Sequence, residues 1–195
     1  MTRRQIFCLY ACFLGEGVDF LLGCVYNIGK RKGGTRMIRI MFVCHGNICR
    51  SPMAEMIMKQ LVREAGRDRD FLIRSSATST EEIVCGVGNP IYPPAKAELM
   101  RHGIACEERH AVQLTAQDYG RYDLFVGMDS ANLRNMQRIF GHDDEGKIRR
   151  LMDYTARKGA DVSDPWYSDR FDVAYRDIYE GCTGLLSVLS NTSNT

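Results

Sequence analysis

The hydrophobic pattern of the chain separates short apolar runs from longer stretches in which apolar residues recur at helical spacing. Four runs are typical of strands, the last of them more exposed than the others: 38–43, 71–73, 123–128 and 147–153. Helical spacing predicts four helices: 52–65, 95–102, 130–140 and 171–189. Residues 75–94 contain glycines and prolines and follow no helical period, so we expect a long loop there.

Strands and helices alternate along the chain, an order that is typical of an α/β fold. We therefore predict a four-stranded parallel sheet with helices on both faces, because parallel strands need crossover connections that helices provide. A ligand site in such a fold is expected at the carboxyl ends of the strands. Glycines follow three of the predicted helices and are expected to end them: Gly66, Gly103 and Gly141.

Composition and charge add few constraints. A length of 195 residues fits one domain with a substantial core. A hydrophobic content of 45% and a charged content of 26% are ordinary for a globular protein. The formal net charge of +2 is too small to predict binding to nucleic acid or to a membrane surface.

Residues 1–36 differ in pattern from the rest of the chain. Arginines and an apolar run at 3–14 are similar to a signal peptide, but Glu16 and Asp19 follow closely. No stretch of about 20 apolar residues remains that could span a membrane. We expect these residues to be a non-native or poorly ordered extension of a domain that spans residues 37–195.

The position of Met37 supports one hypothesis for this extension. Met37 directly precedes the first predicted strand, and Lys32-Gly33-Gly34 can be encoded by codons that contain a bacterial ribosome-binding sequence. Under this hypothesis translation starts at Met37. The alternative is a genuine extension that is loosely attached to the domain.

The chain has eight cysteines. None has C-x-x-C spacing, and no spacing of cysteine and histidine predicts a zinc site, so we expect neither a metal nor another cofactor. A domain of this size needs no disulfides, and we expect reduced thiols in a cytoplasmic protein. Three cysteines are expected to be small, partly buried hydrophobic residues: Cys85, Cys106 and Cys182.

One octapeptide, Cys44 to Ser51, combines several features of a phosphate site. It lies between the first predicted strand and the first predicted helix, and Pro52 fits the first turn of that helix. Free N–H groups and the positive end of the helix dipole then meet at the loop and favour a dianionic phosphate. The same field favours a thiolate nucleophile at Cys44, and Arg50 can bind two phosphoryl oxygens.

The full octapeptide resembles the active-site loop of low-molecular-weight protein tyrosine phosphatases: Cys44-His45-Gly46-Asn47-Ile48-Cys49-Arg50-Ser51. A second segment, Asp164-Pro165-Trp166-Tyr167, resembles the general-acid loop of the same family. The resemblance covers roughly residues 37–190. It implies a phosphatase I-like three-layer architecture and hydrolysis of protein phosphotyrosine through a phosphocysteine intermediate.

The resemblance implies a role for each of these residues. Cys44 is the expected nucleophile, Arg50 the phosphate ligand and Asp164 the general acid, preferred over Asp161. The rings of Trp166 and Tyr167 are expected to wall the pocket. The remaining loop residues are expected to form the phosphate-binding loop: His45, Gly46, Asn47, Ile48, Cys49 and Ser51.

Within that loop the expected roles differ. Asn47 is expected to organise the loop, with Ser75 supporting it, and Ser51 to donate a hydrogen bond to the Cys44 sulfur. His45 is expected to be structural, and Gly46 to supply a backbone conformation that needs no Cβ. Cys49 is expected either to trap oxidised Cys44 as a disulfide or to be a small filler of the loop.

The sequence departs from the family at the expected pocket wall. Many members have an aromatic residue in the loop after Ala77, where this chain has Thr80-Glu81-Glu82-Ile83. Tyr92 is a candidate replacement for that aromatic residue. The departure leaves the chemistry unchanged but puts the substrate specificity in doubt.

Two alternatives stay open at this point. An arsenate reductase shares the fold and the loop, but it needs two further cysteines, for which Cys85 and Cys106 are the candidates. A catalytically silent phosphotyrosine-binding module is the other alternative, and the intact Cys44, Arg50 and Asp164 oppose it. The expected partners are phosphotyrosine proteins, and the expected state is a monomer or weak dimer.

Overall fold

The computed structural model describes residues 37–191. Its main sheet has four parallel strands in the spatial order β2-β1-β5-β6. The strands are β1 (Ile38–Cys44), β2 (Phe71–Ala77), β5 (Leu124–Gly127) and β6 (Ile148–Arg150). The prediction of a four-stranded parallel sheet is therefore confirmed. Because the chain crosses from β2 to the other side of β1 to form β5, the switch point lies at the carboxyl end of β1.

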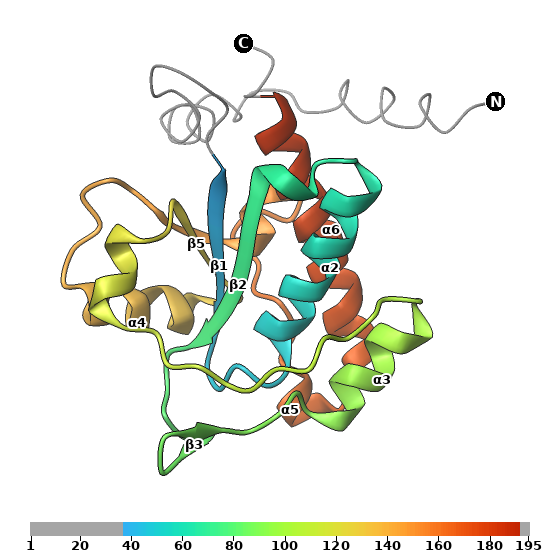
Figure 1. Cartoon of the computed structure of the whole chain (residues 1–195), viewed down its shortest axis with the longest axis horizontal. Coiled ribbons are helices and arrows are strands. Elements are labelled where there is room, and N and C mark those ends of the chain that lie inside the picture. Colours follow the sequence, from blue (N-terminus) through green and yellow to red (C-terminus); the bar gives the residue numbers. More distant parts are fainter. Residues whose placement is uncertain (1–36, 192–195) are drawn as a thin grey trace.

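Helices cover both faces of this sheet, so the predicted three layers are confirmed (Figure 1). One face carries α2 (Arg50–Glu64) and α6 (Phe171–Asn191), with α3 (Pro93–Arg101) packed beside both. The other face carries α4 (Ser130–Phe140) and the short 3₁₀ helix η3 (Ala116–Gly120). No helix within residues 37–191 combines the length and the apolar character needed to cross a membrane.

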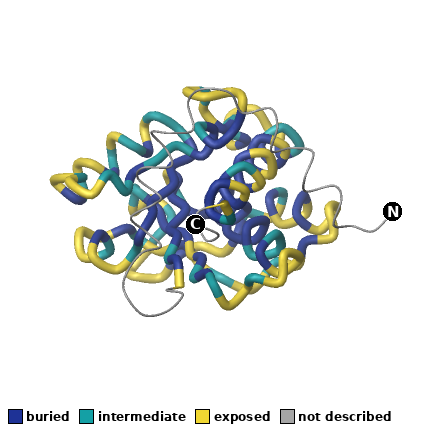
Figure 2. The backbone as a smooth tube through the Cα atoms, turned by 90° about the horizontal axis from the view of Figure 1, so that it is seen from above, coloured by how far each residue is buried: buried dark blue, intermediate teal, exposed yellow. Residues whose placement is uncertain are grey.

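The central strand β1 contributes to the packing on both faces. Ile38, Ile40 and Phe42 belong to the larger hydrophobic cluster with α2 and α6, whereas Met41 and Val43 belong to the smaller cluster with α4. This two-residue alternation is the normal geometry of a strand, and burial on both faces explains the apolar run at residues 40–44. Figure 2 shows the buried backbone at the centre and the exposed segments around it.

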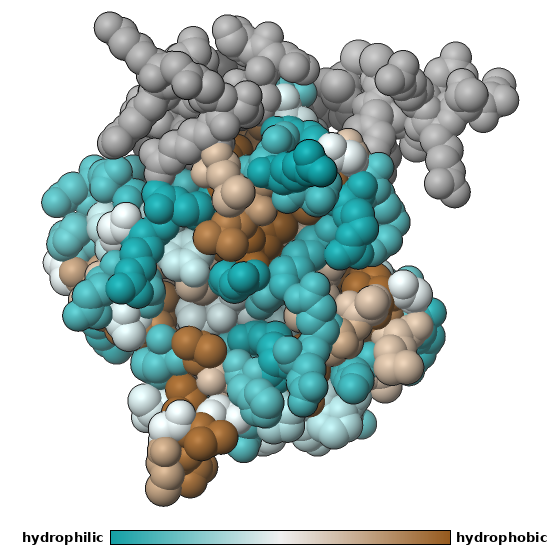
Figure 3. All heavy atoms as spheres, viewed as in Figure 1, coloured by the Kyte–Doolittle hydropathy of each residue, from teal (hydrophilic) through white to brown (hydrophobic). Residues whose placement is uncertain are grey.

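The predicted long loop at 75–94 is corrected by the structure. Strand β2 continues to Ala77, and β3 (Ile83–Val84) and β4 (Val87–Gly88) form an antiparallel hairpin. Its two turn residues, Cys85 and Gly86, have φ angles of 51° and 79°, as expected for a two-residue hairpin turn. The prediction of a partly buried Cys85 is wrong, because the turn exposes it. Figure 3 shows the apolar hairpin at the lower left.

The last predicted strand is also shorter than expected. After β6 the chain forms a 3₁₀ helix, η4 (Leu151–Tyr154), which packs on α6. A Cβ at Gly184 of α6 would overlap the backbone carbonyl of Tyr154, so the glycine permits this close contact. Helix packing therefore ends the strand earlier than its apolar pattern predicts.

Candidate active site

Cys44 lies at the carboxyl end of β1, where the loop that leads into α2 begins. Its sulfur is 3.3 Å from the backbone nitrogen of Asn47 and 3.0 Å from the Ser51 hydroxyl oxygen. The amide of Asn47 donates to that hydroxyl at 2.8 Å, so the Ser51 hydrogen is left for another acceptor. Two acceptors lie within reach of the Ser51 oxygen: the Cys44 sulfur at 3.0 Å and the Ser76 carbonyl oxygen at 3.4 Å. Ser51 is therefore placed to donate to Cys44 when that sulfur is a thiolate, which can only accept.

Asn47 fixes the shape of the loop. Its φ angle of 58° lies in the left-handed region, which asparagine tolerates better than most residues. The side-chain nitrogen donates to Ser51 at 2.8 Å and to Ser75 at 3.0 Å. The side-chain oxygen accepts from Arg109 at 2.6 Å and from the backbone N–H of Val112 at 3.0 Å. Every hydrogen-bonding position of this buried amide is therefore occupied.

A second layer of charged residues lies behind Asn47. Arg109 donates to the Ser75 hydroxyl oxygen at 2.6 Å, and Ser75 donates to the Glu55 carboxylate at 2.6 Å. Arg109 and Glu55 are 3.7 Å apart, and both are largely buried. Burial lowers the pKa of the Arg109 guanidinium, while the Glu55 carboxylate acts in the opposite direction.

Sequence reasoning assigned no role to Arg109 or Glu55. For Glu55 there was a signal, because an acidic residue between Ala54 and Met56 interrupts the apolar face of α2 one turn after Ser51. A buried acid at such a position requires a partner. Arg109 lies in an irregular segment, and nothing in its local pattern points to Asn47.

Arg50 is 4% exposed and pairs with two carboxylates. Its guanidinium nitrogens lie 2.7 Å from Asp129 and 2.6 Å from Asp164. Burial alone would lower the pKa of Arg50, but the negative charges of Cys44, Asp164 and Asp129 outweigh it and raise that pKa. Arg50 is therefore a permanent cation at the base of the loop. Asp129 also begins α4 by accepting from the N–H of Asn132 at 2.7 Å, and the sequence pattern assigned it no role beside Arg50.

Asp164 lies far from Cys44 in the sequence and begins the short helix α5 (Pro165–Ser168). One carboxylate oxygen accepts from the N–H of Trp166 at 3.1 Å, and the other faces Arg50. Asp161 points elsewhere, because it accepts from Ser130 at 3.0 Å and pairs with Arg150 at 3.0 Å. The structure therefore brings Asp164, and not Asp161, to the loop.

These segments enclose a pocket of about 190 Å³. It is lined by residues from the loop after β1, from the segment before β3 and from the segment 164–167, which we call the acid loop. These residues are Cys44, His45, Gly46, Asn47, Ile48, Cys49, Arg50, Glu81, Glu82, Asp164, Trp166 and Tyr167. Trp166 packs on Tyr92, with ring centroids 5.4 Å apart, and Tyr92 packs on Phe171 of α6 at 6.0 Å. Tyr92 thus supports Trp166 from behind and is not among the pocket-lining residues.

The other loop residues occupy distinct environments. Ile48 is buried in the core, and the exposed His45 side chain is 2.9 Å from Glu81. Burial, reinforced by the negative charge of Cys44, raises the pKa of Cys49 to about 12, so this residue is a thiol at neutral pH. The expectation for Gly46 needs a correction. The left-handed residue is Asn47, and a Cβ at Gly46 would instead lie 2.8 Å from the Glu82 side chain.

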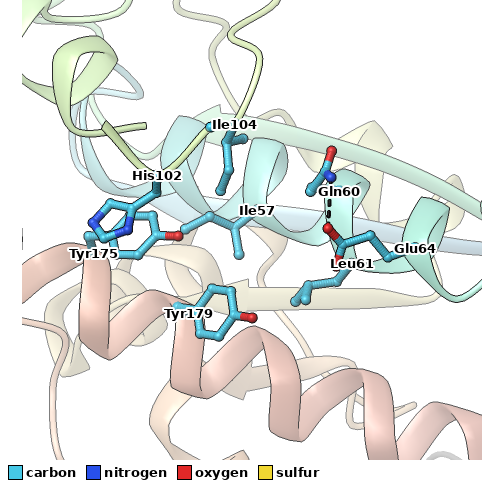
Figure 4. A pocket seen from close by; sticks show the side chains of 9 residues that line it. Ile57, Gln60, Leu61, Glu64, His102, Ile104, Tyr175 and Tyr179 are labelled. Carbon is cyan, nitrogen blue, oxygen red and sulfur yellow. Dashed lines mark hydrogen bonds between the residues drawn. The ribbon is translucent and has the colours of Figure 1, made fainter. Parts of the chain in front are cut away.

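A larger hollow of about 360 Å³ lies away from this loop, between α2, the end of α3 and α6 (Figure 4). His102 stacks on Tyr175 there, with ring centroids 3.7 Å apart. Burial raises the pKa of Tyr175 to about 12, so its phenol is neutral. None of the residues lining this hollow is a lysine, arginine or cysteine, and phosphate chemistry is therefore not expected in it.

Within residues 37–191 no group of three or more histidine, cysteine or acidic side chains could hold a metal ion.

Comparisons with known proteins agree with this geometry. The family model described as low molecular weight phosphotyrosine protein phosphatase matches residues 39–194. The low molecular weight protein-tyrosine-phosphatase YfkJ of Bacillus subtilis is 35% identical over 152 residues, which cover 77% of this chain and 95% of YfkJ. The corresponding phosphatase of Gallus gallus is 36% identical over 145 residues, covering 73% of this chain and 87% of that protein.

Solved structures of proteins from the same family have a similar fold. The crystal structure of SP-PTP, a low molecular weight protein tyrosine phosphatase from Streptococcus pyogenes, has a TM-score of 0.68 and 36% identity, covering 77% of this chain and 92% of the other. The crystal structure of YfkJ from Bacillus subtilis has a TM-score of 0.72 and 31% identity, and the match covers 83% of this chain and 98% of YfkJ. This chain belongs to the low molecular weight phosphotyrosine protein phosphatase family.

Proposed function

We propose that this protein hydrolyses phosphotyrosine in proteins through a phosphocysteine intermediate on Cys44. The observation that carries the proposal is the meeting of three groups in one pocket: the Cys44 sulfur, the Arg50 guanidinium and the Asp164 carboxyl group. Aromatic rings of Trp166 and Tyr167 line the same pocket and suit a phenyl phosphate.

In the first step the Cys44 thiolate attacks phosphorus in line, and the bond between phosphorus and the tyrosyl oxygen breaks. Asp164 gives its proton to that oxygen, so that tyrosine leaves as a neutral phenol. Arg50 and the backbone N–H groups of the loop hold the equatorial oxygens, where the charge of the transition state lies.

In the second step Asp164, now ionised, takes a proton from water. The water oxygen attacks phosphorus, the bond between sulfur and phosphorus breaks, and inorganic phosphate leaves. The electron pair returns to Cys44, and the hydrogen bond from Ser51 stabilises the thiolate that forms. The chain's own residues therefore supply nucleophile, acid, base and phosphate ligand.

Cys49 has a proposed protective role beside this cycle. Its thiol can condense with a sulfenic acid at Cys44: the Cys49 sulfur loses its proton as the disulfide bond forms, and the sulfenic hydroxyl leaves with a proton as water. The disulfide is reversible, whereas further oxidation of Cys44 to a sulfonic acid is not.

The two alternatives have less support. A reductase needs two further cysteines near the nucleophile, yet neither Cys85 nor Cys106 is among the residues that line the pocket. The relatives described above are named as phosphatases. A silent binding module has no need for Asp164 beside Arg50.

The proposed substrates are phosphotyrosine proteins, and the proposed setting is a reducing cytoplasm with the protein as a monomer or weak dimer.

The decisive experiment is hydrolysis of para-nitrophenyl phosphate and of a phosphotyrosine peptide in the presence of a metal chelator. Thioredoxin-coupled arsenate reduction is measured in parallel. Release of phosphate from both esters without arsenate reduction supports the proposal. Arsenate reduction without ester hydrolysis would replace it by the reductase.

A further inference from the structure

Two adjacent acidic residues lie at the mouth of the catalytic pocket, in the segment where the family resemblance fails. Glu81 and Glu82 both line the pocket, together with Trp166 and Tyr167 of the acid loop. Glu81 is 70% exposed, and Glu82 is half-buried. We call these two glutamates the acidic rim.

The acidic rim is fixed to the catalytic loop. The N–H of Thr78 donates to the carbonyl of Cys44 at 2.9 Å, and the N–H of Ser79 donates to the carbonyl of His45 at 3.0 Å. The side chain of Glu82 fills the space beside Gly46 that a Cβ would otherwise occupy. These contacts place both carboxylates next to any phosphate ester bound in the loop.

Each carboxylate has a defined partner. Glu82 accepts from the side-chain nitrogen of Asn89 at 2.7 Å, and its carbonyl accepts from the N–H of Asn89 at 2.8 Å. Both groups of Asn89 are neutral amides, so the negative charge of Glu82 is not neutralised by this residue. Among the described residues, the Glu81 carboxylate faces only the exposed His45 ring at 2.9 Å, an imidazole that is charged only when protonated.

The charge around the entrance is therefore negative. Three acidic residues line the pocket, Glu81, Glu82 and Asp164, and the cation at its base, Arg50, is already paired with Asp129 and Asp164. A substrate with acidic residues beside its phosphotyrosine meets repulsion at this rim. A substrate with basic residues there finds a partner.

We propose that the acidic rim makes this phosphatase selective for phosphotyrosines flanked by lysine or arginine, whose side chains pair with Glu81 and Glu82. The inference rests on the proposed phosphatase activity and names its substrate class. Because pairs between exposed charges are weak, the expected preference is about fivefold in kcat/KM for each charge. It should shrink at high salt, which screens exposed charges.

The test compares two phosphotyrosine peptides that differ only in the flanking residues, lysine in one and glutamate in the other. The wild-type protein should prefer the lysine peptide, and more so at low salt. The double variant Glu81→Gln/Glu82→Gln should lose the preference, and so should Glu81→Lys, because the new cation offsets the remaining charge of Glu82. The control is Asp144→Lys, which changes the net charge by the same amount as either rim variant, at an 88% exposed position in the loop between α4 and β6. It should keep the preference.

Each outcome has a separate meaning. Equal kcat/KM for both peptides, while the wild-type protein still turns over para-nitrophenyl phosphate, overturns the acidic rim and leaves the phosphatase proposal intact. The same holds if Asp144→Lys changes the preference as much as the double variant. Failure of the wild-type protein on para-nitrophenyl phosphate would instead contradict the proposed function itself.

Discussion

The guanidinium of Arg50 and the carboxylate of Asp164 form an ion pair at 2.6 Å, so the proposed phosphate ligand and the proposed general acid contact each other directly. A phosphoryl group that binds Arg50 at this nitrogen takes the place of Asp164. The carboxylate is then free to face the oxygen of the leaving group. The pair therefore links phosphate binding to the position of the acid.

Asp164→Ala should lower kcat for phosphotyrosine by roughly 10²–10⁴-fold, because the leaving phenoxide is no longer protonated. Para-nitrophenyl phosphate should lose less, since nitrophenoxide leaves without that help. Inorganic phosphate should inhibit the variant more strongly, because its competitor for Arg50 has gone. Steady-state kinetics with both esters and with phosphate as inhibitor measure all three effects. Equal losses for both esters would contradict the role of Asp164, and Asp161→Ala is the matched control.

Cys44→Ser should abolish turnover and leave the fold intact. A serine hydroxyl is almost fully protonated at neutral pH, so the first step lacks its nucleophile. The measurement is kcat for para-nitrophenyl phosphate, with circular dichroism as the check on folding. Turnover near the wild-type level would exclude Cys44 as the nucleophile.

Arg109→Met should destabilise the protein and slow catalysis. It removes two short charged hydrogen bonds, to Asn47 and Ser75, at a cost of roughly 1.5–3 kcal/mol for each bond in the free energy of unfolding. The effect on kcat should exceed that of the exposed control Arg138→Met, because Asn47 holds the catalytic loop. Urea denaturation and kinetics on both variants test this. Unchanged kcat in Arg109→Met would show that the loop keeps its shape without this arginine.

The stability of the protein should fall as the pH rises above about 9, where free thiols ionise. Burial raises the pKa of Cys182, so the folded state keeps a proton that the unfolded state loses. The stabilising contribution is complete below the unfolded pKa and is lost progressively above it, by up to about 1.4 kcal/mol per pH unit.

Cys182→Ala should therefore flatten the alkaline decline of the unfolding free energy. The exposed Cys85→Ala serves as the control and should leave the slope unchanged. Denaturation under reducing conditions at several alkaline pH values measures both slopes. Identical slopes in the two variants would contradict a contribution from Cys182.

Deletion of residues 1–36 should leave the melting temperature and kcat/KM nearly unchanged. The sheet begins at Ile38, and every residue that lines the pocket follows it in the chain. Residues 1–36 lie outside the described part of the chain. The mass of the natively expressed protein tests separately the hypothesis that translation starts at Met37. A large loss of melting temperature on deletion would contradict the proposed domain boundary.

The parts of the fold that depend on local pattern were predicted well. Burial on both faces makes β1 apolar from Ile40 onward, and the segment after it combines Cys44, Arg50 and Pro52 within a few residues. The β3–β4 hairpin was missed, because Val84 and Val87 are exposed and the turn is Cys85-Gly86 rather than a typical Asn-Gly.

The parts of the site that depend on distant segments could not be predicted from pattern. Asp164 was found only through the family resemblance, and no role at the site was predicted for Asp129. The contact between Arg109 and Asn47 joins residues 62 positions apart, and no local rule relates them. What the sequence lacks is the spatial order of the strands, which brings these segments to the end of β1.

The ion pairs of Arg50 make the site depend on the completion of the chain. The loop with Cys44 is synthesised early, but its cation is paired by carboxylates at positions 129 and 164. A nascent chain that has emerged only as far as α4 has the nucleophile without the acid. Phosphatase activity is therefore a direct reporter of complete folding, and ester hydrolysis during refolding can be timed against the fluorescence of Trp166, the one tryptophan of the sequence, as it packs on Tyr92.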